Sequence, residues 1–397
     1  MVALAEPGTK QRIASIDILR GLVMLIMAID HTRDFFHLGH PDTNDLATTT
    51  PILFFTRWIT HFCAPTFVFL SGVSAYLAGT RRTKKELSSF LIKRGLWLIM
   101  VELVLITFAI TLDPGFRIVI LQVIWAIGGS MILLGLLVWL PLPAIAAIGA
   151  VIFFGHNLFD INKVSAVNDT LLGKLLISGR RGDFWPLATG RKLAIAYSLL
   201  PWTAAMLMGY VFGSLYQKSF DALKRKKVLL YAGLSFLALF LVFRYLNLYG
   251  DPAPWSVQKS TALSIISFFN VTKYPCSLLY LSMTLGAAMV VLAVTESVSN
   301  KFSKILIIYG NVPFFYYVYH WYLIKLLNII AFFAWGYNTS QIVNPNPRVR
   351  NFQPPGFGFD LFGVYVVWLL VIIILYLPCR WYYNYKRTHH QWWLSYL

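Results

Sequence analysis

The sequence predicts an all-α protein, a polytopic bundle of transmembrane helices that forms one domain over residues 1–397. Hydrophobic residues make up 58% of the chain and charged residues only 13%, whereas about one-quarter of a typical soluble domain is charged. The apolar residues also gather in windows that approach the roughly 20 residues a helix needs to cross a bilayer. We predict about ten spans, at 14–36, 52–79, 95–112, 117–139, 141–156, 193–216, 228–248, 274–294, 305–331 and 361–382.

Basic residues set the predicted orientation of these spans. Lys and Arg number 34 against 16 Asp and Glu, a formal net charge of +18. In a soluble protein this excess would suggest nucleic acid, but no basic stripe falls on a soluble segment, so we expect no nucleic-acid partner. The positive-inside rule instead places the basic loops in the cytoplasm. With ten spans both termini then lie inside (N-in/C-in), and the basic segments are 81–94, 218–227 and 380–387.

Small residues and turn residues mark where successive spans pack and end. The second span carries a set of small residues that allow close helix packing: Ser71, Gly72, Ser74, Ala75 and Gly79. Asp113-Pro114-Gly115 separates the third span from the fourth, and Pro141-Leu142-Pro143 separates the fourth from the fifth. Two outer loops are long, about 157–192 and 332–360, and long loops on one face often carry function.

The first span is unusually polar for a membrane helix. In the stretch IDILRGLVMLIMAIDHTRDFFH (16–37), only nine uncharged residues separate Arg20 from Asp30. Six residues follow steps of three and four and therefore share one helix face: Asp17, Arg20, Met24, Met27, His31 and Asp34. We predict that the segment crosses as one helix whose charged residues face the bundle interior, and that this face lines a channel.

Within this helix, His31 is the candidate general base. Ionisable groups inside a membrane are costly, and function is the default explanation for them. His31 lies i,i+3 from Asp34 and beside Asp30, and a carboxylate that orients a histidine is typical of general-base catalysis. Asp17 and Arg20 are also spaced i,i+3 and can pair. A purely structural role, fixing the register of the helix, is the main alternative for that second pair.

Other polar residues lie in apolar segments at similar depth. His61 follows Arg57 by four residues in the second span, Glu102 lies in the middle of the third, and His320 lies deep in the ninth. Each alone is better explained as a hydrogen-bonded residue of the bundle. Convergence of the histidines on one cavity would instead indicate a site.

Metal and disulfide chemistry find little support. The three cysteines, Cys63, Cys276 and Cys379, show no CxxC or Cys/His spacing. His37 and His40 could ligate a metal at i,i+3, but a solvated loop edge is the commoner explanation. We therefore expect no metal.

Several segments together resemble a known family. The first-helix stretch SIDILRGLVMLIMAIDHTRDFF resembles the signature of bacterial heparan-α-glucosaminide N-acetyltransferase-like integral membrane proteins, part of the wider transmembrane acyltransferase superfamily. Six further segments are similar to bacterial members: FCAPTFVFLSGVSAYL (62–77), FLIKRGLWLIMVELVL (90–105), LQVIWAIGGSMILLG (121–135), YSLLPWTAAMLMGYVFG (197–213), KYPCSLLYLSMTLG (273–286) and GNVPFFYYVYHWYLI (310–324).

The resemblance implies transfer of an acetyl group from cytoplasmic acetyl-CoA, the co-substrate, to an extracytoplasmic glycan, amino sugar or other cell-envelope acceptor. It also implies a bacterial cytoplasmic membrane. His31 falls on the catalytic-site histidine of the O-acyltransferase branch. The lysosomal branch has Asn at this position and its histidine about eleven residues later, where this chain has Asp42. The amino-sugar specificity of that branch is therefore not carried over.

These inferences give each candidate residue a role. We expect the acetyl-CoA phosphates near Lys93 and Arg94, and the pantetheine arm along the first helix past Arg20. His31 acts as base, oriented by Asp34 or Asp30. Three residues of the second and ninth spans are expected to bind the acceptor or to stabilise the oxyanion: Arg57, His61 and His320.

Two other classes of function stay open at this point: a proton-coupled transporter or flippase, and a non-enzymatic membrane assembly protein. The choice between O- and N-transfer, the acyl chain length and the oligomeric state, a homodimer included, are also open.

Overall fold

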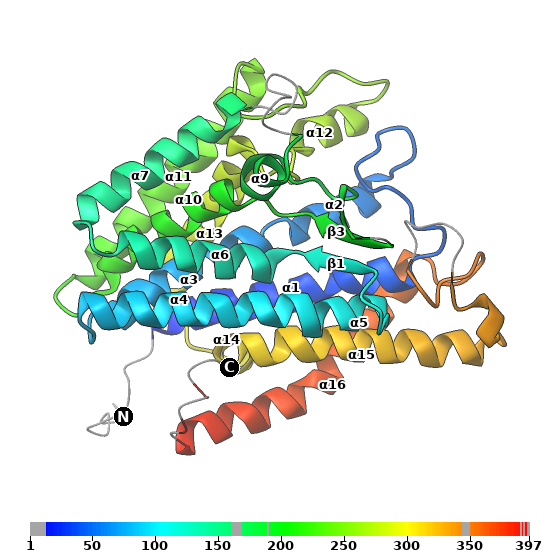
Figure 1. Ribbon diagram of the computed structural model, residues 1–397. Helices are drawn as coiled ribbons and strands as arrows, with labels where there is room; N and C mark the ends of the chain where they lie inside the picture. The colour runs from blue at the N-terminus through cyan, green and yellow to red at the C-terminus, as the bar shows by residue number, and fades with distance from the viewer. Residues whose placement is uncertain are drawn as a thin grey trace.

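The computed structural model describes residues 13–159, 169–188, 190–343, 350–389, 391 and 394, and it is mostly helical. The long helices run side by side, with α1 in the middle of the bundle (Figure 1). The helices are α1 (Ala14–Phe36), α2 (Pro51–Thr60), α3 (Cys63–Gly79), α4 (Lys84–Val101), α5 (Thr107–Thr111), α6 (Val123–Leu137), α7 (Leu142–Gly155), α9 (Leu171–Gly173), α10 (Leu199–Phe212), α11 (Ala222–Leu246), α12 (Thr261–Phe269), α13 (Leu278–Thr295), α14 (Lys301–Asn311), α15 (Pro313–Ala334) and α16 (Leu361–Thr388).

The helices account for the predicted spans. In the described part of the chain, eight helical segments are long and apolar enough to cross a membrane: Pro51–Gly79, Lys84–Thr111, Leu142–Phe159, Leu199–Tyr216, Ala222–Leu246, Leu278–Thr295, Pro313–Ala334 and Leu361–Thr388. Helix α6 is apolar but shorter, with 15 residues. Helix α1 is long enough, with 23 residues, but it carries more charge than an ordinary membrane span. All ten predicted windows therefore contain a helix, and the prediction that 14–36 forms one continuous helix is confirmed.

Several predicted boundaries are wrong because prolines and strands interrupt the apolar windows. The window 305–331 covers parts of two helices: α14 ends at Asn311, and α15 begins with Pro313 at its first position. A proline lacks the N–H that would continue a helix but is well suited to begin one. The second window is likewise divided, into α2 and α3, at His61 and Phe62.

A small sheet, which the all-α prediction missed, covers one end of the bundle. Strand β3 (Arg191–Ile195) lies between β1 (Ile118–Leu121), to which it is parallel, and β2 (Phe184–Ala188), to which it is antiparallel. Strands β1 and β3 occupy the beginnings of the predicted spans 117–139 and 193–216. Periodicity alone does not distinguish a short apolar strand from a buried helical turn.

Helix α1 packs against α2, α3, α13, α14, α15 and α16, so its charged residues lie inside the bundle as predicted. Its closest crossing is with α14, where a Cβ on Gly310 would lie only 2.0 Å from the backbone oxygen of Asp17. Asn311 donates to the Asp17 carboxylate (3.0 Å), and Arg20 donates both to Asp17 (3.2 Å) and to the Gly310 carbonyl (3.1 Å). The predicted Asp17–Arg20 pair is confirmed, and it fastens α1 to α14.

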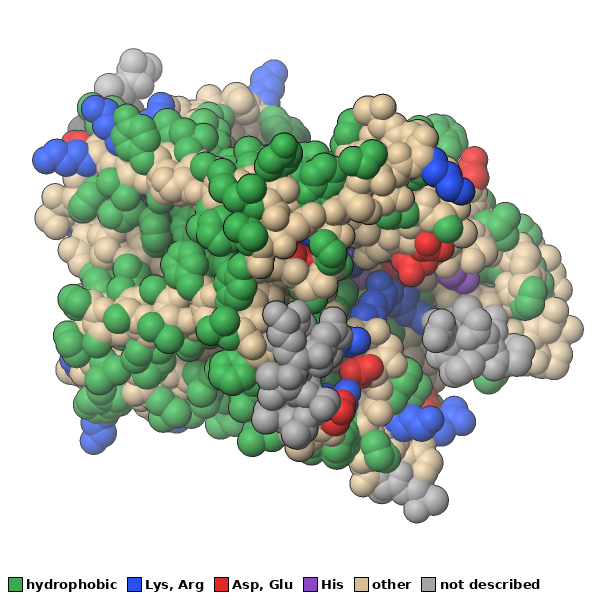
Figure 2. Space-filling model, turned by 90° about the horizontal axis from the view of Figure 1, so that it is seen from above, with side chains coloured by type: hydrophobic (Ala, Val, Ile, Leu, Met, Phe, Trp, Pro, Cys, Tyr) green, Lys and Arg blue, Asp and Glu red, His purple; other side chains and the backbone are tan. Residues whose placement is uncertain are grey.

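The outer surface of the bundle has the character expected of a membrane protein. In Figure 2 hydrophobic side chains cover most of the long helices, and charged side chains gather toward the two ends of the molecule. Apolar side chains facing lipid need no protein partner, which explains why α16 and α11 remain largely uncovered.

Candidate functional site

Two cavities lie at opposite ends of α1. The larger, about 1670 Å³, is formed by the N-terminal end of α1 together with the segments that follow α3, α6 and α10. These segments include loops predicted to be cytoplasmic, and the structure brings them to one end of the bundle. Five cations and one acid are among the described residues that line this cavity: Arg81, Arg82, Lys84, Lys218, Arg225 and Glu296.

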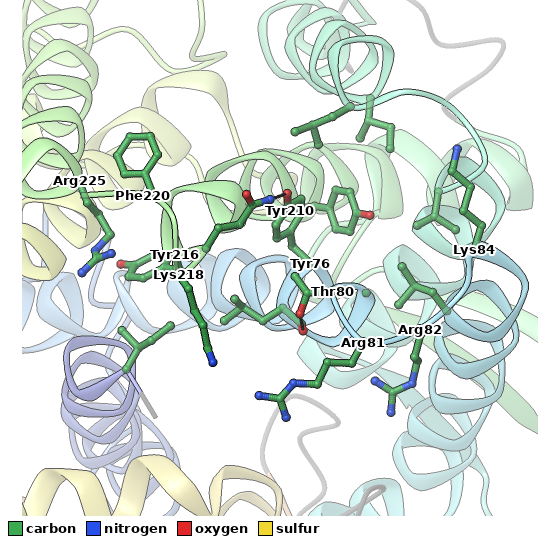
Figure 3. A pocket seen from close by; sticks show the side chains of 18 of the residues that line it. Tyr76, Thr80, Arg81, Arg82, Lys84, Tyr210, Tyr216, Lys218, Phe220 and Arg225 are labelled. Atoms are coloured by element: carbon green, nitrogen blue, oxygen red, sulfur yellow. Dashed lines mark hydrogen bonds between the residues drawn. The ribbon is translucent and has the colours of Figure 1, made fainter. Parts of the chain in front are cut away.

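The wall of the basic cavity combines these cations with aromatic rings (Figure 3). Tyr76 and Tyr210 meet edge to face with their ring centroids 5.3 Å apart. Arg225 pairs with Glu296 and also lies over the ring of Tyr216, 5.1 Å from its centroid. The cavity therefore offers positive charge and flat apolar surfaces together.

The predicted phosphate ligands lie elsewhere. Lys93 is exposed on the middle of α4, and neither Lys93 nor Arg94 is among the described residues that line the two cavities. Arg20 follows Ser15, which lines the basic cavity, by five residues. Its guanidinium donates hydrogen bonds to Asp17, to the Gly310 carbonyl and, at 3.1 Å, to the Ser74 hydroxyl. Cations at the helix ends therefore line the large cavity, and the predicted cofactor residues do not.

The second cavity, about 130 Å³, lies at the C-terminal end of α1. It is enclosed by α1, the N-terminal half of α3, the start of α6, strand β3 with the residues that follow it, and one or two residues from each of six other segments: Thr60, Ile120, Arg181 and Gly182, Lys273 and Tyr274, Trp321, and Arg350. His31, Asp30 and Asp34 all line it. The three residues predicted to be catalytic are thus brought together, although their roles remain predictions.

Two of the three candidate histidines converge at this cavity. The rings of His31 and His320 lie with their centroids 5.2 Å apart, and Trp321 packs against His31 at 3.9 Å. His320 is fully buried behind the cavity wall, and its Nδ1 donates to the Tyr316 carbonyl at 3.1 Å. His61 instead packs on Tyr280 at 5.5 Å. In the described chain it makes no ring contact with the other two.

The carboxylates beside His31 are held by arginines. Asp30 accepts from Arg33 at 2.8 Å and from Arg57 at 2.6 Å. The Arg57–Asp30 pair ties α2 to α1. Arg57, predicted to bind the acceptor, also donates to Thr60 at 2.9 Å. It is not among the described residues that line the cavity.

Asp34 binds three arginines and leaves His31 without the predicted carboxylate partner. It accepts from Arg33 (3.2 Å), Arg181 (2.8 Å) and Arg350 (3.1 Å). Hydrogen bonds from a guanidinium to a carboxylate are stronger than those from a neutral ring, so the arginines take precedence. The Nδ1 atom of His31 is buried without a hydrogen-bond partner among the described residues.

Sequence reasoning missed the cavity residues that come from loops. Arg181 and Arg350 lie in the two long outer loops, parts of which (160–168, 189 and 344–349) fall outside the described residues. Arg350 also donates to the Asp34 carbonyl at 3.0 Å, and Gln353 donates to the Asp34 and Phe35 carbonyls at 2.9 Å each. Because these carbonyls end α1, the second loop caps the helix that carries His31. Loop length was the available signal, but it did not identify the residues.

Glu102 is a hydrogen-bonded residue of the bundle, as predicted. It begins a π-helical segment (Glu102–Ile106) that joins α4 to α5. Its fully buried carboxylate accepts from the backbone N–H groups of Gln122 (3.2 Å) and Trp125 (3.1 Å). Glu102 therefore caps the N-terminus of α6, where a negative charge is favourable.

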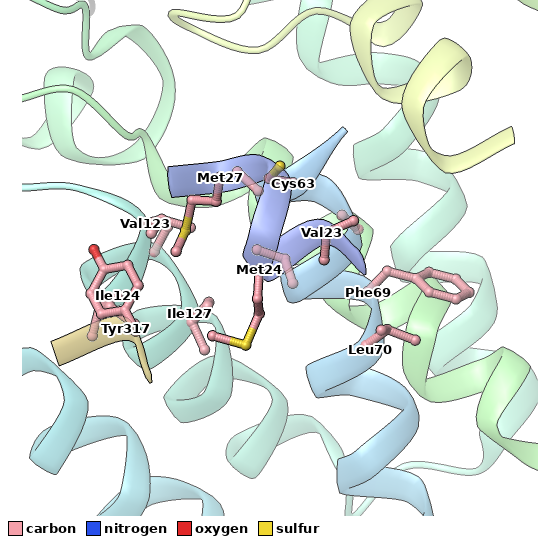
Figure 4. Packing of buried hydrophobic residues seen from close by; sticks show 14 of the residues in the cluster. Val23, Met24, Met27, Cys63, Phe69, Leu70, Val123, Ile124, Ile127 and Tyr317 are labelled. Atoms are coloured by element: carbon pink, nitrogen blue, oxygen red, sulfur yellow. The ribbon is translucent and has the colours of Figure 1, made fainter. Parts of the chain in front are cut away.

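The predicted channel along α1 is closed in this structure. Between the two cavities, Met24 of α1 points toward Ile127, while Met27, which lines the small cavity, lies beside Val123 (Figure 4). Met24 is only 1% exposed. The expectation of an open tunnel is therefore wrong for this conformation, because apolar side chains fill the space between the ends.

Fold and site together define a polytopic membrane protein whose central, polar helix joins a large basic cavity to a small cavity that contains a histidine. Residues 12–246, more than half of the chain, match the family model for the catalytic domain of heparan-alpha-glucosaminide N-acetyltransferase. The chain belongs to this family and is an acetyl-CoA-dependent membrane N-acetyltransferase. The family assignment favours the enzyme over the transporter and the assembly protein. The search of curated proteins found no match to this chain.

Proposed function

We propose that the protein transfers an acetyl group from cytoplasmic acetyl-CoA to an amino sugar or other glycan acceptor on the opposite face, with His31 as general base. The observation that carries this proposal is the pair of cavities at the two ends of α1, one basic and one containing His31. An N-in/C-in arrangement, in which α1 and α6 cross together with the eight apolar segments, places the basic cavity in the cytoplasm.

The basic cavity is the proposed binding site for the nucleotide part of acetyl-CoA. Its cations suit phosphates, which arginine binds in a bidentate manner, and the rings of Tyr76 and Tyr210 offer surfaces for the base. This replaces Lys93 and Arg94 as the proposed phosphate ligands. Ser15 in this cavity and His31 are sixteen residues apart on one helix, about 24 Å along its axis.

The linear arm of the co-substrate fits the path along α1 once the methionines move. Met24 and Met27 have flexible, unbranched side chains that repack readily. With the arm in place, the thioester would reach the small cavity while the nucleotide stays at the cytoplasmic end.

At His31 the chemistry is that of acyl transfer. The acceptor nitrogen attacks the carbonyl carbon of the thioester as His31 takes the proton from that nitrogen. Collapse of the tetrahedral intermediate breaks the C–S bond, and His31 returns the proton to the departing sulfur of CoA. A hydroxyl acceptor would follow the same steps. Asp30 and Asp34 contribute by holding the surrounding arginines, and through them the end of α1.

The proposal is tested with the purified full chain in lipid nanodiscs. Acetyl-CoA labelled in its acetyl group is incubated with a panel of amino sugars and glycan fragments. We expect the wild-type protein to label at least one acceptor and to release free CoA in equal amount. Binding of acetyl-CoA without transfer to any amine or hydroxyl acceptor would contradict the assignment of the acceptor class.

Neutralising the basic cavity is expected to weaken the binding of CoA. The double substitution Arg81→Gln, Lys218→Gln removes two cations, and we expect Kd to rise about tenfold, or about 1.4 kcal/mol. The control is Lys226→Gln, Lys227→Gln, which removes two exposed cations of α11 outside the cavity. Isothermal titration in nanodiscs measures both. A larger effect from Lys93→Gln, Arg94→Gln would favour the earlier assignment instead.

A further inference from the structure

Lys273 is a buried cation for which the proposed mechanism has no use. It lines the cavity of His31 and is 8% exposed. The arginines around this cavity are paired with Asp30 or Asp34. Among the described residues, in contrast, no carboxylate lies within ion-pairing distance of the Lys273 ammonium. A buried charge without a counter-ion is costly and needs an explanation.

The neighbour of this ammonium is a phenol. Tyr274 lines the same cavity, and the Lys273 Nζ lies 5.2 Å from the centroid of its ring. Tyr274 also packs edge to face on Tyr197, with centroids 5.4 Å apart. An N–H donor and an O–H donor are thus placed side by side on the wall of a cavity that also contains His31.

The segment that carries both residues is held rigidly. The fully buried guanidinium of Arg244 donates to four carbonyls, those of Ala253, Ser267, Phe268 and Asn270, at 2.6–3.0 Å. Asp251 accepts from the backbone and the hydroxyl of Thr272 (2.8 and 2.9 Å) and from the Ser277 hydroxyl (2.7 Å). Hydrogen-bond donors that are fixed before the reaction stabilise a developing charge without reorganisation.

We propose that Lys273 and Tyr274 are catalytic residues that stabilise the oxyanion formed on the acetyl carbonyl. When the acceptor nitrogen attacks, the C–N bond forms and the carbonyl π electrons move to oxygen. The Lys273 ammonium and the Tyr274 hydroxyl donate to that oxygen. When the C=O bond re-forms, the C–S bond breaks, and its electrons leave with the sulfur, which receives the proton held by His31. This inference rests on the proposed acyl transfer at the His31 cavity.

The electrostatics of the cavity give this pair a pH signature. The charged and titratable groups around Tyr274 come from several elements: Asp30, Arg57, Arg181, Tyr197, Lys273 and Tyr280. Burial by itself would raise the pKa of the Tyr274 phenol, but Lys273, Arg57 and Arg181 outweigh it and lower this pKa to about 8. As the pH rises through this value, the phenol loses the proton that it donates, and its new negative charge opposes the oxyanion. Transfer should therefore fall on the alkaline side of pH 8.

The test compares kcat, KM and the pH profile of the full-length protein in nanodiscs. Loss of one oxyanion donor typically lowers kcat by about 100- to 1000-fold, so we expect this loss for Lys273→Met, with partial recovery in Lys273→Arg. The affinity for CoA should not change, because the nucleotide is bound at the other end of α1. Tyr274→Phe should lower kcat about tenfold or more and remove the alkaline limb near pH 8.

Tyr197→Phe is the matched control for the pH profile. Tyr197 lines the same cavity and touches Tyr274, but burial raises the pKa of its phenol well above the usual value, so its loss should leave the alkaline limb in place. A normal kcat in Lys273→Met, a change confined to KM, or an alkaline limb in Tyr274→Phe that stays at the wild-type pH would overturn the inference. If Lys273→Met does not fold, the profile of Tyr274→Phe decides. Failure of the wild-type protein itself to transfer acetyl groups would instead overturn the proposed function.

Discussion

Replacing His31 with alanine is expected to lower acetyl transfer by about 100- to 10,000-fold, the range that a general base contributes. The ring lines the small cavity, and its buried Nδ1 has no hydrogen-bond partner among the described residues. Asp30 and Asp34 also line the cavity, but both carboxylates are bound by arginines, which makes them poor substitutes for the base. Steady-state transfer of labelled acetyl groups measures the loss, and binding of CoA, which we propose to occur at the distant basic cavity, shows that the variant is folded.

His37→Ala is the control for this substitution. His37 directly follows α1, six residues after His31, and its ring Nδ1 lies 2.9 Å from the Leu38 carbonyl at an exposed position. His37 is not among the described residues that line either cavity. We therefore expect the rate of acetyl transfer to change less than twofold. If His31→Ala kept more than about a tenth of the wild-type rate while His37→Ala lost it, the base would have to be sought outside the cavity.

Replacing Gly209 with alanine is expected to have the largest effect on stability. Helices α3 and α10 cross so closely that a Cβ on Gly209 would lie 1.9 Å from the backbone oxygen of Phe69. At the same crossing a Cβ on Gly72 would lie 2.1 Å from the Met206 oxygen. Because backbone atoms cannot rotate away, the two helices must separate. We expect a loss of about 3 kcal/mol or more, the upper end for overpacking, seen as a lower Tm in detergent.

Gly155→Ala is the matched control, since it makes the same change near the end of α7. A Cβ at this position would have no atom within 4 Å, and alanine is favoured over glycine in a helix by about 0.5–1 kcal/mol. We therefore expect an unchanged or slightly higher Tm. Equal effects of the two substitutions would contradict the close crossing of α3 and α10.

Much of the helical framework could be predicted because its signals are local. Each apolar window that we predicted as a span contains a helix in the structure. The small residues around Gly72 predicted a close helix crossing, and the structure confirms it. The boundaries were less accurate. Pro313 begins a new helix inside a continuous apolar window, and β1 and β3 occupy apolar stretches that a short window cannot tell from helix.

The candidate site could be predicted only where it lies on one element. The spacing along the first span placed Asp30, His31 and Asp34 near one another, and it correctly paired Asp17 with Arg20. It did not show that Asp34 would bind Arg181 and Arg350. These partners are 147 and 316 residues away in the chain, and no local pattern relates residues at such separations.

By itself, the sequence determined the class of protein and the polar face of α1, and it predicted His31 as the base. These properties depend on composition and on the period of one helix. Only the tertiary structure decided that arginines hold the carboxylates beside His31, and that Lys273 and Tyr274 share its cavity. It also decided that cations at the helix ends line the basic cavity. Such contacts depend on how loops fold over the ends of the bundle, where packing of the whole chain brings distant charges together.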